Sequence, residues 1–261
     1  MSFADINGQR IRFEDSGGSG PPVILSHGFL MDHEMFAPQV DALAPEFRVI
    51  TWDERGFGET QFDGRPFTYW DSARDCLGLL DYLDIKRAVL GGMSQGGFLS
   101  LRAALLAPER VRALVLIDTQ SGTEDPDRLP ASRQMQQTWL EVGPVDELAQ
   151  TIANLIVGDP VLNAHRIAKW RKLPRETLRA PGDCLLDRDD ITDRLDEITC
   201  PAIVFHGTAD VSIEIDKAQA LCRALSGCTR VVHVEGAPHA SNLTHPEQVN
   251  GPLLEFLRSV D

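Results

Sequence analysis

Short apolar runs alternate with helix-like segments along most of this chain. The runs are unbroken rather than interrupted by polar residues, which indicates strands that are buried on both faces of a parallel sheet. At the N-terminus, Asn7-Gly8 is a strong hairpin turn signal between two short strands. The eight predicted strands are residues 3–6, 10–14, 22–26, 47–52, 87–90, 111–117, 202–205 and 230–234.

Helical patterns fall between these strands. Strands that alternate with helices predict an α/β fold, in which helices cover both faces of a mostly parallel sheet. In such a sheet, functional residues gather at the carboxyl ends of the strands. The predicted helices are residues 34–44, 68–83, 96–107, 216–225 and 245–259.

One region, residues 122–198, breaks this alternation. It contains no convincing strand, only helix-like segments rich in charge. Because it follows the sixth strand, we expect a helical cap above the strand ends, inserted into a single domain whose core is 1–121 and 199–261. A set of ordinary packing helices is the alternative. The predicted helices of this region are residues 131–141, 145–157, 160–172 and 175–186.

The charge of the chain indicates which partners it does not bind, and its N-terminus indicates where it is located. The formal net charge is −14, from 25 Lys and Arg against 39 Asp and Glu, and a field of that sign opposes binding to nucleic acid or anionic membranes. No apolar stretch approaches the length of a membrane span. The N-terminus lacks the basic and apolar regions of a secretory signal. We therefore expect a cytoplasmic protein.

The cysteines and histidines give no sign of a metal site. The five cysteines follow no C-x-x-C pattern, and the seven histidines form no H-E-x-x-H motif. We expect most of the cysteines to be small, buried apolar residues. We expect no metal and no cofactor.

The most informative motif surrounds Ser94, in Gly92-Met93-Ser94-Gln95-Gly96. It follows a predicted strand and opens a predicted helix. The two glycines let the strand and the helix approach closely, as a sharp strand-to-helix turn requires. Such a turn lifts the serine hydroxyl clear of the sheet, at a helix N-terminus that favours developing negative charge. The motif therefore predicts a nucleophilic serine.

A serine nucleophile needs a base, and the base needs a carboxylate that orients it. The expected chain order is serine, acid, histidine. Asp210, a few residues past the seventh strand, is the first candidate acid, and Asp118, at the end of the sixth strand, is the second choice. His239 follows the last strand in a loop with glycine and proline and is the candidate base, while His206 and His245 are weaker alternatives.

At this point the residues resemble the α/β-hydrolase superfamily over nearly the whole chain. The matching features are His27-Gly28, Asp53-Glu54-Arg55-Gly56-Phe57-Gly58, the Ser94 turn, Phe205–Gly207 with Asp210, and Pro238-His239. The segment from His239 to Glu247 is similar to the H-x-S-N-x-x-x-P-E ending of 3-oxoadipate enol-lactonases, and the chain also resembles cofactor-free haloperoxidase-type esterases. Phe57 is a departure, because the D-x-R-G-H-G motif of the family has histidine there.

The resemblance implies hydrolysis of a carboxylic ester or lactone through an acyl-enzyme, without a cofactor. Ser94 would attack the carbonyl, His239 would take its proton and Asp210 would fix the imidazole. The backbone amides of Phe29 and Gln95 would form the oxyanion hole. The expected partner is a small-molecule ester or lactone.

Other functions stay open at this point. Carbon–carbon hydrolases of ring-cleavage products use the same triad, and some proteins of this fold act mainly as small-molecule receptors with slow turnover. Perhydrolysis is a side activity that the resemblance permits. Arg166, Trp170 and Arg171 could bind a carboxylate and an apolar body, although a solvated helix face is the more ordinary interpretation. Neither the substrate nor the oligomeric state follows from the sequence.

Overall fold

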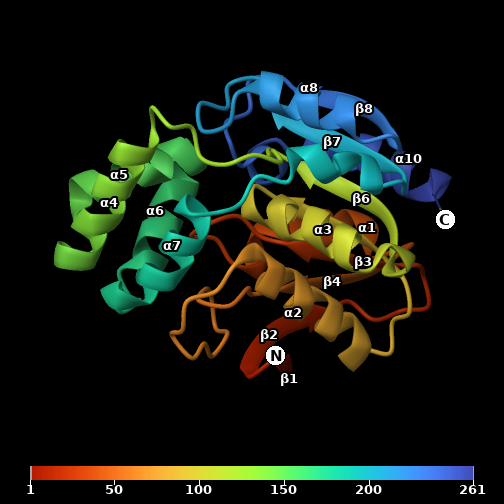
Figure 1. The fold of residues 1–261 in the computed structure, drawn as a ribbon, viewed down its shortest axis with the longest axis horizontal. Helices are drawn as coiled ribbons and strands as arrows, with labels where there is room; N and C mark the ends of the chain where they lie inside the picture. Colours follow the sequence, from red (N-terminus) through yellow and green to blue (C-terminus); the bar gives the residue numbers. More distant parts are fainter. Residues whose placement is uncertain (1, 261) are drawn as a thin grey trace.

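An eight-stranded sheet forms the centre of the protein, whose computed structural model describes residues 2–260 (Figure 1). The strand order is β1-β2-β4-β3-β5-β6-β7-β8. β2 pairs antiparallel with β1 and β4, and the other neighbouring pairs are parallel, which confirms the mostly parallel sheet. The strands are β1 (Ser2–Ile6), β2 (Gln9–Asp15), β3 (Pro22–Ser26), β4 (Arg48–Trp52), β5 (Ala88–Met93), β6 (Val111–Ile117), β7 (Ala202–Gly207) and β8 (Cys228–Val234).

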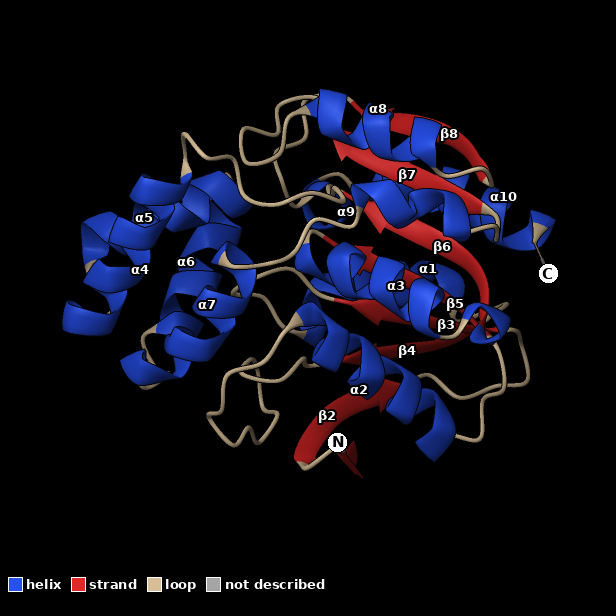
Figure 2. Cartoon of the chain, in the orientation of Figure 1, coloured by secondary structure: helices blue, strands red, loops and turns tan. Residues whose placement is uncertain are grey.

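Helices cover both faces of this sheet (Figure 2). In β3, Ile24 belongs to one buried apolar cluster, whereas Val23 and Leu25 belong to the other. Burial of both faces is the reason that the strands are unbroken apolar runs. The first cluster packs under α2 (Tyr69–Tyr82), α3 (Gln95–Leu106) and α8 (Ile215–Ala224), and the second under α1 (Ala37–Leu43) and α10 (Pro246–Ser259).

Four helices between β6 and β7 form a separate group. Figure 2 shows that the parallel strands point toward this group, so it lies at their carboxyl ends. We call residues 122–198 the α4–α7 segment. Its helices are α4 (Leu129–Val142), α5 (Asp146–Ile156), α6 (Pro160–Trp170) and α7 (Arg179–Leu186). The remaining short elements of the described chain are η1 (His33–Phe36), η2 (Pro108–Arg110), η3 (Arg175–Leu178), η4 (Thr192–Glu197) and α9 (Ser241–Thr244).

The main difference from the sequence prediction concerns the end of β5. The strand continues to Met93, beyond the predicted end at residue 90. The added residues include Gly91, and a Cβ there would lie only 2.7 Å from a methyl carbon of Leu25 on the neighbouring strand. Consecutive glycines are a turn signal in sequence, but here Gly91 lies within the sheet close to Leu25, and Gly92 lies against the backbone of α3.

One disulfide was not foreseen. Cys222 and Cys228 are bonded and join α8 to the start of β8, whereas Cys76 and Cys184 are buried thiols as expected. Disulfides are typical of oxidising compartments, while the sequence predicts a cytoplasmic protein. Among the described residues, no helix has the length and apolar character needed to cross a membrane.

Candidate active site

Ser94 lies at the sharp turn between β5 and α3. Its backbone has φ 51° and ψ −112°, a left-handed conformation that costs free energy for any residue with a Cβ. Its N–H donates to the carbonyl of Ile117 over 2.8 Å, and its own carbonyl accepts from the N–H of Gly97 over 2.9 Å and from the Thr119 hydroxyl over 2.8 Å. These bonds, from β6 and α3, hold the serine in its strained conformation.

The two glycines of the motif allow this turn to form. A Cβ on Gly92 would lie 2.0 Å from the carbonyl carbon of Gly96, and a Cβ on Gly96 would lie 1.9 Å from the carbonyl oxygen of Ser26. Both distances are far below van der Waals contact, so no other residue fits at either position. The glycines are therefore explained by the close approach of α3 to β5 and β3.

His239 and Asp210 form a buried pair in the loops that follow β8 and β7. Nδ1 of His239 lies 2.7 Å from Oδ2 of Asp210. The other carboxylate oxygen of Asp210 accepts the N–H groups of Ser212 at 2.8 Å and Ile213 at 3.1 Å. Burial opposes the charged imidazole, but attraction to Asp210 outweighs it, so the pKa of His239 is raised. The same pairing overcomes burial and lowers the pKa of Asp210.

Asp118, the second candidate acid, has different partners. It is fully buried at the end of β6. Its Oδ1 accepts the N–H of Gly207 at 2.8 Å, and its Oδ2 accepts the N–H and the hydroxyl of Ser241 at 3.0 and 2.5 Å. Burial and the neighbouring charge of Asp210 raise the pKa of Asp118 to about 7. Asp118 thus anchors the loop that follows His239, whereas Asp210 contacts the imidazole.

The two alternative histidines have other hydrogen-bond partners, although Nε2 of His206 lies 3.6 Å from Asp210. Nε2 of His206 faces the carbonyl oxygen of Ile213 at 2.9 Å, and Nδ1 of His245 lies 2.9 Å from the Thr244 hydroxyl. Of the three candidate bases, His239 is the one that lines the same cavity as Ser94.

A cluster of potential metal ligands overlaps this site. Asp118, His206 and Asp210 each offer one ligand atom, and these atoms lie within 4.8 Å of one another. However, the carboxylate oxygens already accept hydrogen bonds from backbone amides, from Ser241 and from His239. Nε2 of His206 must carry a proton to bond with the Ile213 carbonyl. The carboxylate oxygens and Nε2 of His206 are thus engaged within the protein, whereas Nδ1 of His206 has no hydrogen-bond partner among the described residues.

Ser94 and His239 line a cavity of about 520 Å³, which we call the serine cavity. Residues of α3, α4, α5 and α7 contribute to its walls. Most of the lining side chains are apolar, among them Phe29, Leu30, Met93, Phe98, Met135, Ile152, Leu155, Ile156, Leu178, Leu185, Leu186, Val211 and Ile213. Such a cavity suits a largely apolar small molecule whose reactive group meets the serine.

The backbone amides of Phe29 and Gln95, proposed for the oxyanion hole, come from two different segments of the chain. Phe29 is in the loop after β3, and Gln95 is the first residue of α3, where a helix leaves its N–H groups without intrahelical acceptors. Within the described part of the chain, neither N–H donates to a protein acceptor. The two amides are therefore available to an acceptor on a ligand.

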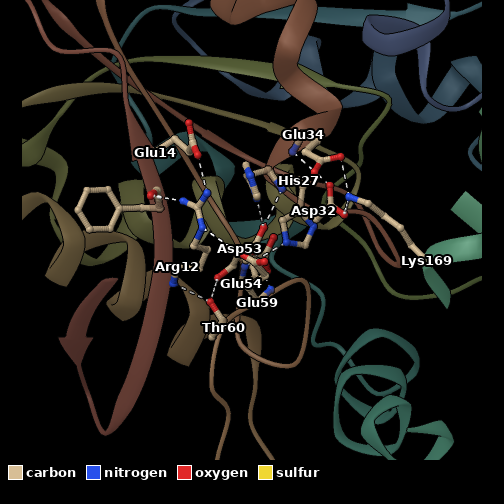
Figure 3. Close-up of polar contacts among 12 residues, drawn as sticks. Arg12, Glu14, His27, Asp32, Glu34, Asp53, Glu54, Glu59, Thr60 and Lys169 are labelled. Carbon is tan, nitrogen blue, oxygen red and sulfur yellow. Dashed lines mark hydrogen bonds and ion pairs between the residues drawn. The ribbon is translucent and has the colours of Figure 1, made fainter. Parts of the chain in front are cut away.

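The segment that begins at Asp53 ties down the loop that carries Phe29. His27 accepts the N–H of Glu54 at 3.0 Å, and Oδ1 of Asp53 accepts the N–H of His33 at 2.8 Å (Figure 3). The ring of Phe57 packs edge-on against the rings of His27 and Phe29, with centroids 5.3 and 5.6 Å away. Phe57 thus contributes packing at the position where the related motif has histidine.

A second cavity of about 700 Å³ lies between α6 and this loop, and we call it the charged cavity. Arg166 reaches Asp32 over 2.9 Å. Lys169 reaches both Asp32 and Glu34 over 2.6 Å (Figure 3). Here the carboxylate bound by Arg166 belongs to the protein.

Trp170 lines the charged cavity as well. Its indole N–H donates to the carbonyl of Leu30 over 2.7 Å. Arg171 pairs with Asp146 at the surface. Arg166, Trp170 and Arg171 are therefore absent from the described lining of the serine cavity. The solvated helix face that the sequence favoured is correct for Arg171 and wrong for Arg166 and Trp170, which are buried.

Sequence reasoning also missed a residue of the serine cavity. Arg188 lines it with a side chain that is 2% exposed. In the sequence it stands among aspartates in Asp187-Arg188-Asp189-Asp190, a pattern typical of a solvated loop. No signal in the chain marks it as buried, because its burial depends on how α7 packs against α3.

Comparisons with known proteins agree with this fold. A family profile described as alpha/beta hydrolase fold matches residues 21–246, so the chain belongs to that family. The chain is 28% identical to a pimeloyl-[acyl-carrier protein] methyl ester esterase of Xanthomonas oryzae, over 93% of this chain and 97% of that one.

Two solved structures are similar over nearly their whole length. A thermophilic esterase from Thermogutta terrifontis has a TM-score of 0.88 at 30% identity, covering 100% of this chain and 99% of that one. An enol-lactonase from Burkholderia xenovorans has a TM-score of 0.89 at 27% identity, covering 98% and 100%. The resemblance to this superfamily and to enol-lactonases is confirmed, and the family supports a hydrolase activity.

Proposed function

We propose that this protein hydrolyses a carboxylic ester or lactone through an acyl-enzyme on Ser94. The observation that carries the proposal is the convergence of Ser94 and His239 on one apolar cavity, with Asp210 bonded to the far side of the imidazole. Relatives whose names describe an esterase, a methyl ester esterase and an enol-lactonase favour the same reaction class.

In the proposed mechanism, Ser94 attacks the substrate carbonyl while Nε2 of His239 removes the hydroxyl proton. Asp210 holds the proton on Nδ1 and stabilises the imidazolium that forms. The unpaired amides of Phe29 and Gln95 donate to the developing oxyanion. His239 then protonates the leaving alcohol, and a water molecule that it deprotonates releases the acid from Ser94.

We further propose that the α4–α7 segment caps this site within a single domain. Its support is that residues of α4, α5 and α7 line the serine cavity opposite the strand ends. In this arrangement the core, 1–121 and 199–261, supplies the reacting groups, and the segment sets the shape of the space that the substrate fills. Substrate preference would then depend mainly on the α4–α7 segment.

The direct test compares two serines of the same cavity. Ser94→Ala should lower kcat on p-nitrophenyl acetate by on the order of a millionfold, because it removes the nucleophile. Ser132→Ala, which changes another serine of the lining, should leave kcat within about twofold. Steady hydrolysis by a folded Ser94→Ala variant at the wild-type rate would refute the proposal. A wild-type protein that turns over once and stops would instead indicate a receptor.

A further inference from the structure

Arg188 places a buried cation in a mostly apolar cavity. It follows α7, lines the serine cavity and has a side chain that is 2% exposed. The carbon atom at the centre of its guanidinium lies 4.7 Å from the ring centroid of Phe98. Phe98 stands in the first turn of α3, directly after Ser94. The guanidinium is thus held over the first turn of α3, which follows the proposed nucleophile Ser94.

The protein uses only part of this guanidinium. Nε donates to the carbonyl of Gly122 over 3.0 Å, and Nη1 donates to the carbonyl of Leu185 over 2.7 Å and to Glu124 over 3.2 Å. Among the described residues, Nη2 has no hydrogen-bond acceptor. Nη2 is not fully buried, and Arg188 lines the serine cavity, so this donor is open to an acceptor inside the cavity. Arg188 therefore presents one spare, rigidly held donor.

The neighbouring charges decide what kind of acceptor fits. Glu124 already balances the charge of Arg188, and Asp127 also lines the cavity. A substrate carboxylate at this point would face both acids and gain no unpaired cation. Arg128 does not change the balance, because it is committed to Glu214 and to two carbonyls of the loop after β7. An uncharged oxygen is the acceptor that meets no repulsion here.

We propose that Nη2 of Arg188 donates a hydrogen bond to an uncharged oxygen on the acyl chain of the substrate. The substrates are then esters or lactones whose acyl group carries an oxo, hydroxyl or ether oxygen. The acyl group takes part both in the acylation of Ser94 and in the hydrolysis of the acyl-enzyme. A donor held beside α3 can therefore bind it in both steps. This inference rests on the proposed serine hydrolase function.

The test uses p-nitrophenyl esters of straight-chain acids with one oxo group moved stepwise along the chain. Each is compared with the parent ester without the oxo group, and each kcat/KM is divided by the uncatalysed hydrolysis rate of that ester. At least one oxo ester should be preferred by about tenfold, the worth of a hydrogen bond to a charged donor. In Arg188→Met that preference should vanish, so that each oxo ester and its parent ester have the same normalised kcat/KM.

A second variant keeps the proposal testable if Arg188→Met fails to fold. Glu124→Gln leaves Arg188 in place and removes its counter-charge. The ratio of kcat/KM for p-nitrophenyl hemisuccinate to that for p-nitrophenyl pentanoate, which has the same length, should rise about tenfold in this variant. An unchanged ratio, a wild-type enzyme that prefers no oxo ester, or a preference that survives in Arg188→Met would overturn the inference. If p-nitrophenyl acetate turnover still depends on Ser94, the failure concerns Arg188 alone.

Discussion

The two cavities of this protein share a wall and differ in chemistry. Leu30 and Leu178 line both. In the larger, charged cavity, Asp32 is paired with Arg166 and Lys169, and Lys169 also contacts Glu34. In the smaller serine cavity, the backbone amide of Phe29 and one guanidinium nitrogen of Arg188 have no partner among the described residues, and neither has the amide of Gln95, which directly follows Ser94. We therefore base the proposed reaction site on unsatisfied donors beside a strained serine, and not on cavity volume.

Among these variants, the largest loss of turnover is expected when the carboxylate that contacts His239 is removed. Asp210→Asn should lower kcat roughly ten-thousandfold, because the imidazole loses the partner that fixes its tautomer. Asp118→Asn should cost far less, about tenfold, since Asp118 anchors Ser241 instead. Turnover of both variants on one ester gives the ranking, and the reverse order would make Asp118 the catalytic acid.

The pH profile sharpens the role of His239. Its pKa is raised above the ordinary 6.5 despite burial, through Asp210. Only the neutral imidazole is a base, so kcat/KM should fall about tenfold per pH unit as pH drops below that raised pKa. In Asp210→Asn burial remains without the carboxylate, so the acidic limb should move to lower pH. A limb that stays in place would mean that another group titrates.

His239 should affect stability and activity in opposite directions as pH changes. Because folding raises the pKa of His239, protonation of this group favours the folded state. That contribution is full below the unfolded-state pKa and is lost as pH rises through the folded-state pKa. Denaturant midpoints measured over the same pH range therefore separate a loss of activity at low pH from a loss of folded protein.

A smaller effect is expected when Trp170 loses its hydrogen bond to Leu30, which lines both cavities. Leu30 has a positive φ of 59°, and its carbonyl is held by the indole N–H of Trp170. Trp170→Phe removes that bond next to the Phe29 amide. It should lower the free energy of unfolding by about 1–3 kcal/mol and kcat several-fold, with KM little changed. An unaltered kcat would show that the Leu30 backbone holds its position without α6.

The smallest effect is expected in the charged cavity. Glu34→Gln weakens one contact of Lys169, which keeps its contact with Asp32. Because the Glu34 side chain is half exposed, the loss should change neither kcat nor KM by more than about twofold. Steady-state kinetics on the same ester provide the check. A large loss of activity would show that the charged cavity takes part in the reaction.

Features that depend on short stretches of sequence, such as strands and turns, could be predicted. Unbroken apolar runs gave the sheet, because its strands are buried on both faces. The glycines around Ser94 gave the turn, because no side chain fits there. The order of residues along the chain predicted Asp210 and His239 as partners, and in the structure the two side chains are in hydrogen-bond contact.

The contacts of the α4–α7 segment could not be predicted, because they depend on how distant parts of the chain pack. Arg188 sits among acidic residues in sequence, yet its side chain is buried over Phe98, which precedes it by many residues. Trp170 and Arg166 have the residue types of a ligand site, but their partners are Leu30 and Asp32. One-dimensional patterns report which face of an element is apolar, and not which partner that face meets.

The central claim is that Ser94 is the nucleophile of a turning-over hydrolase. The most direct measurement is to label the protein with a fluorophosphonate, map the adduct by mass spectrometry and follow turnover of p-nitrophenyl acetate in parallel. The account predicts one adduct, on Ser94, that abolishes sustained turnover in proportion to labelling. An adduct on another residue, or full turnover by protein labelled on Ser94, would contradict it.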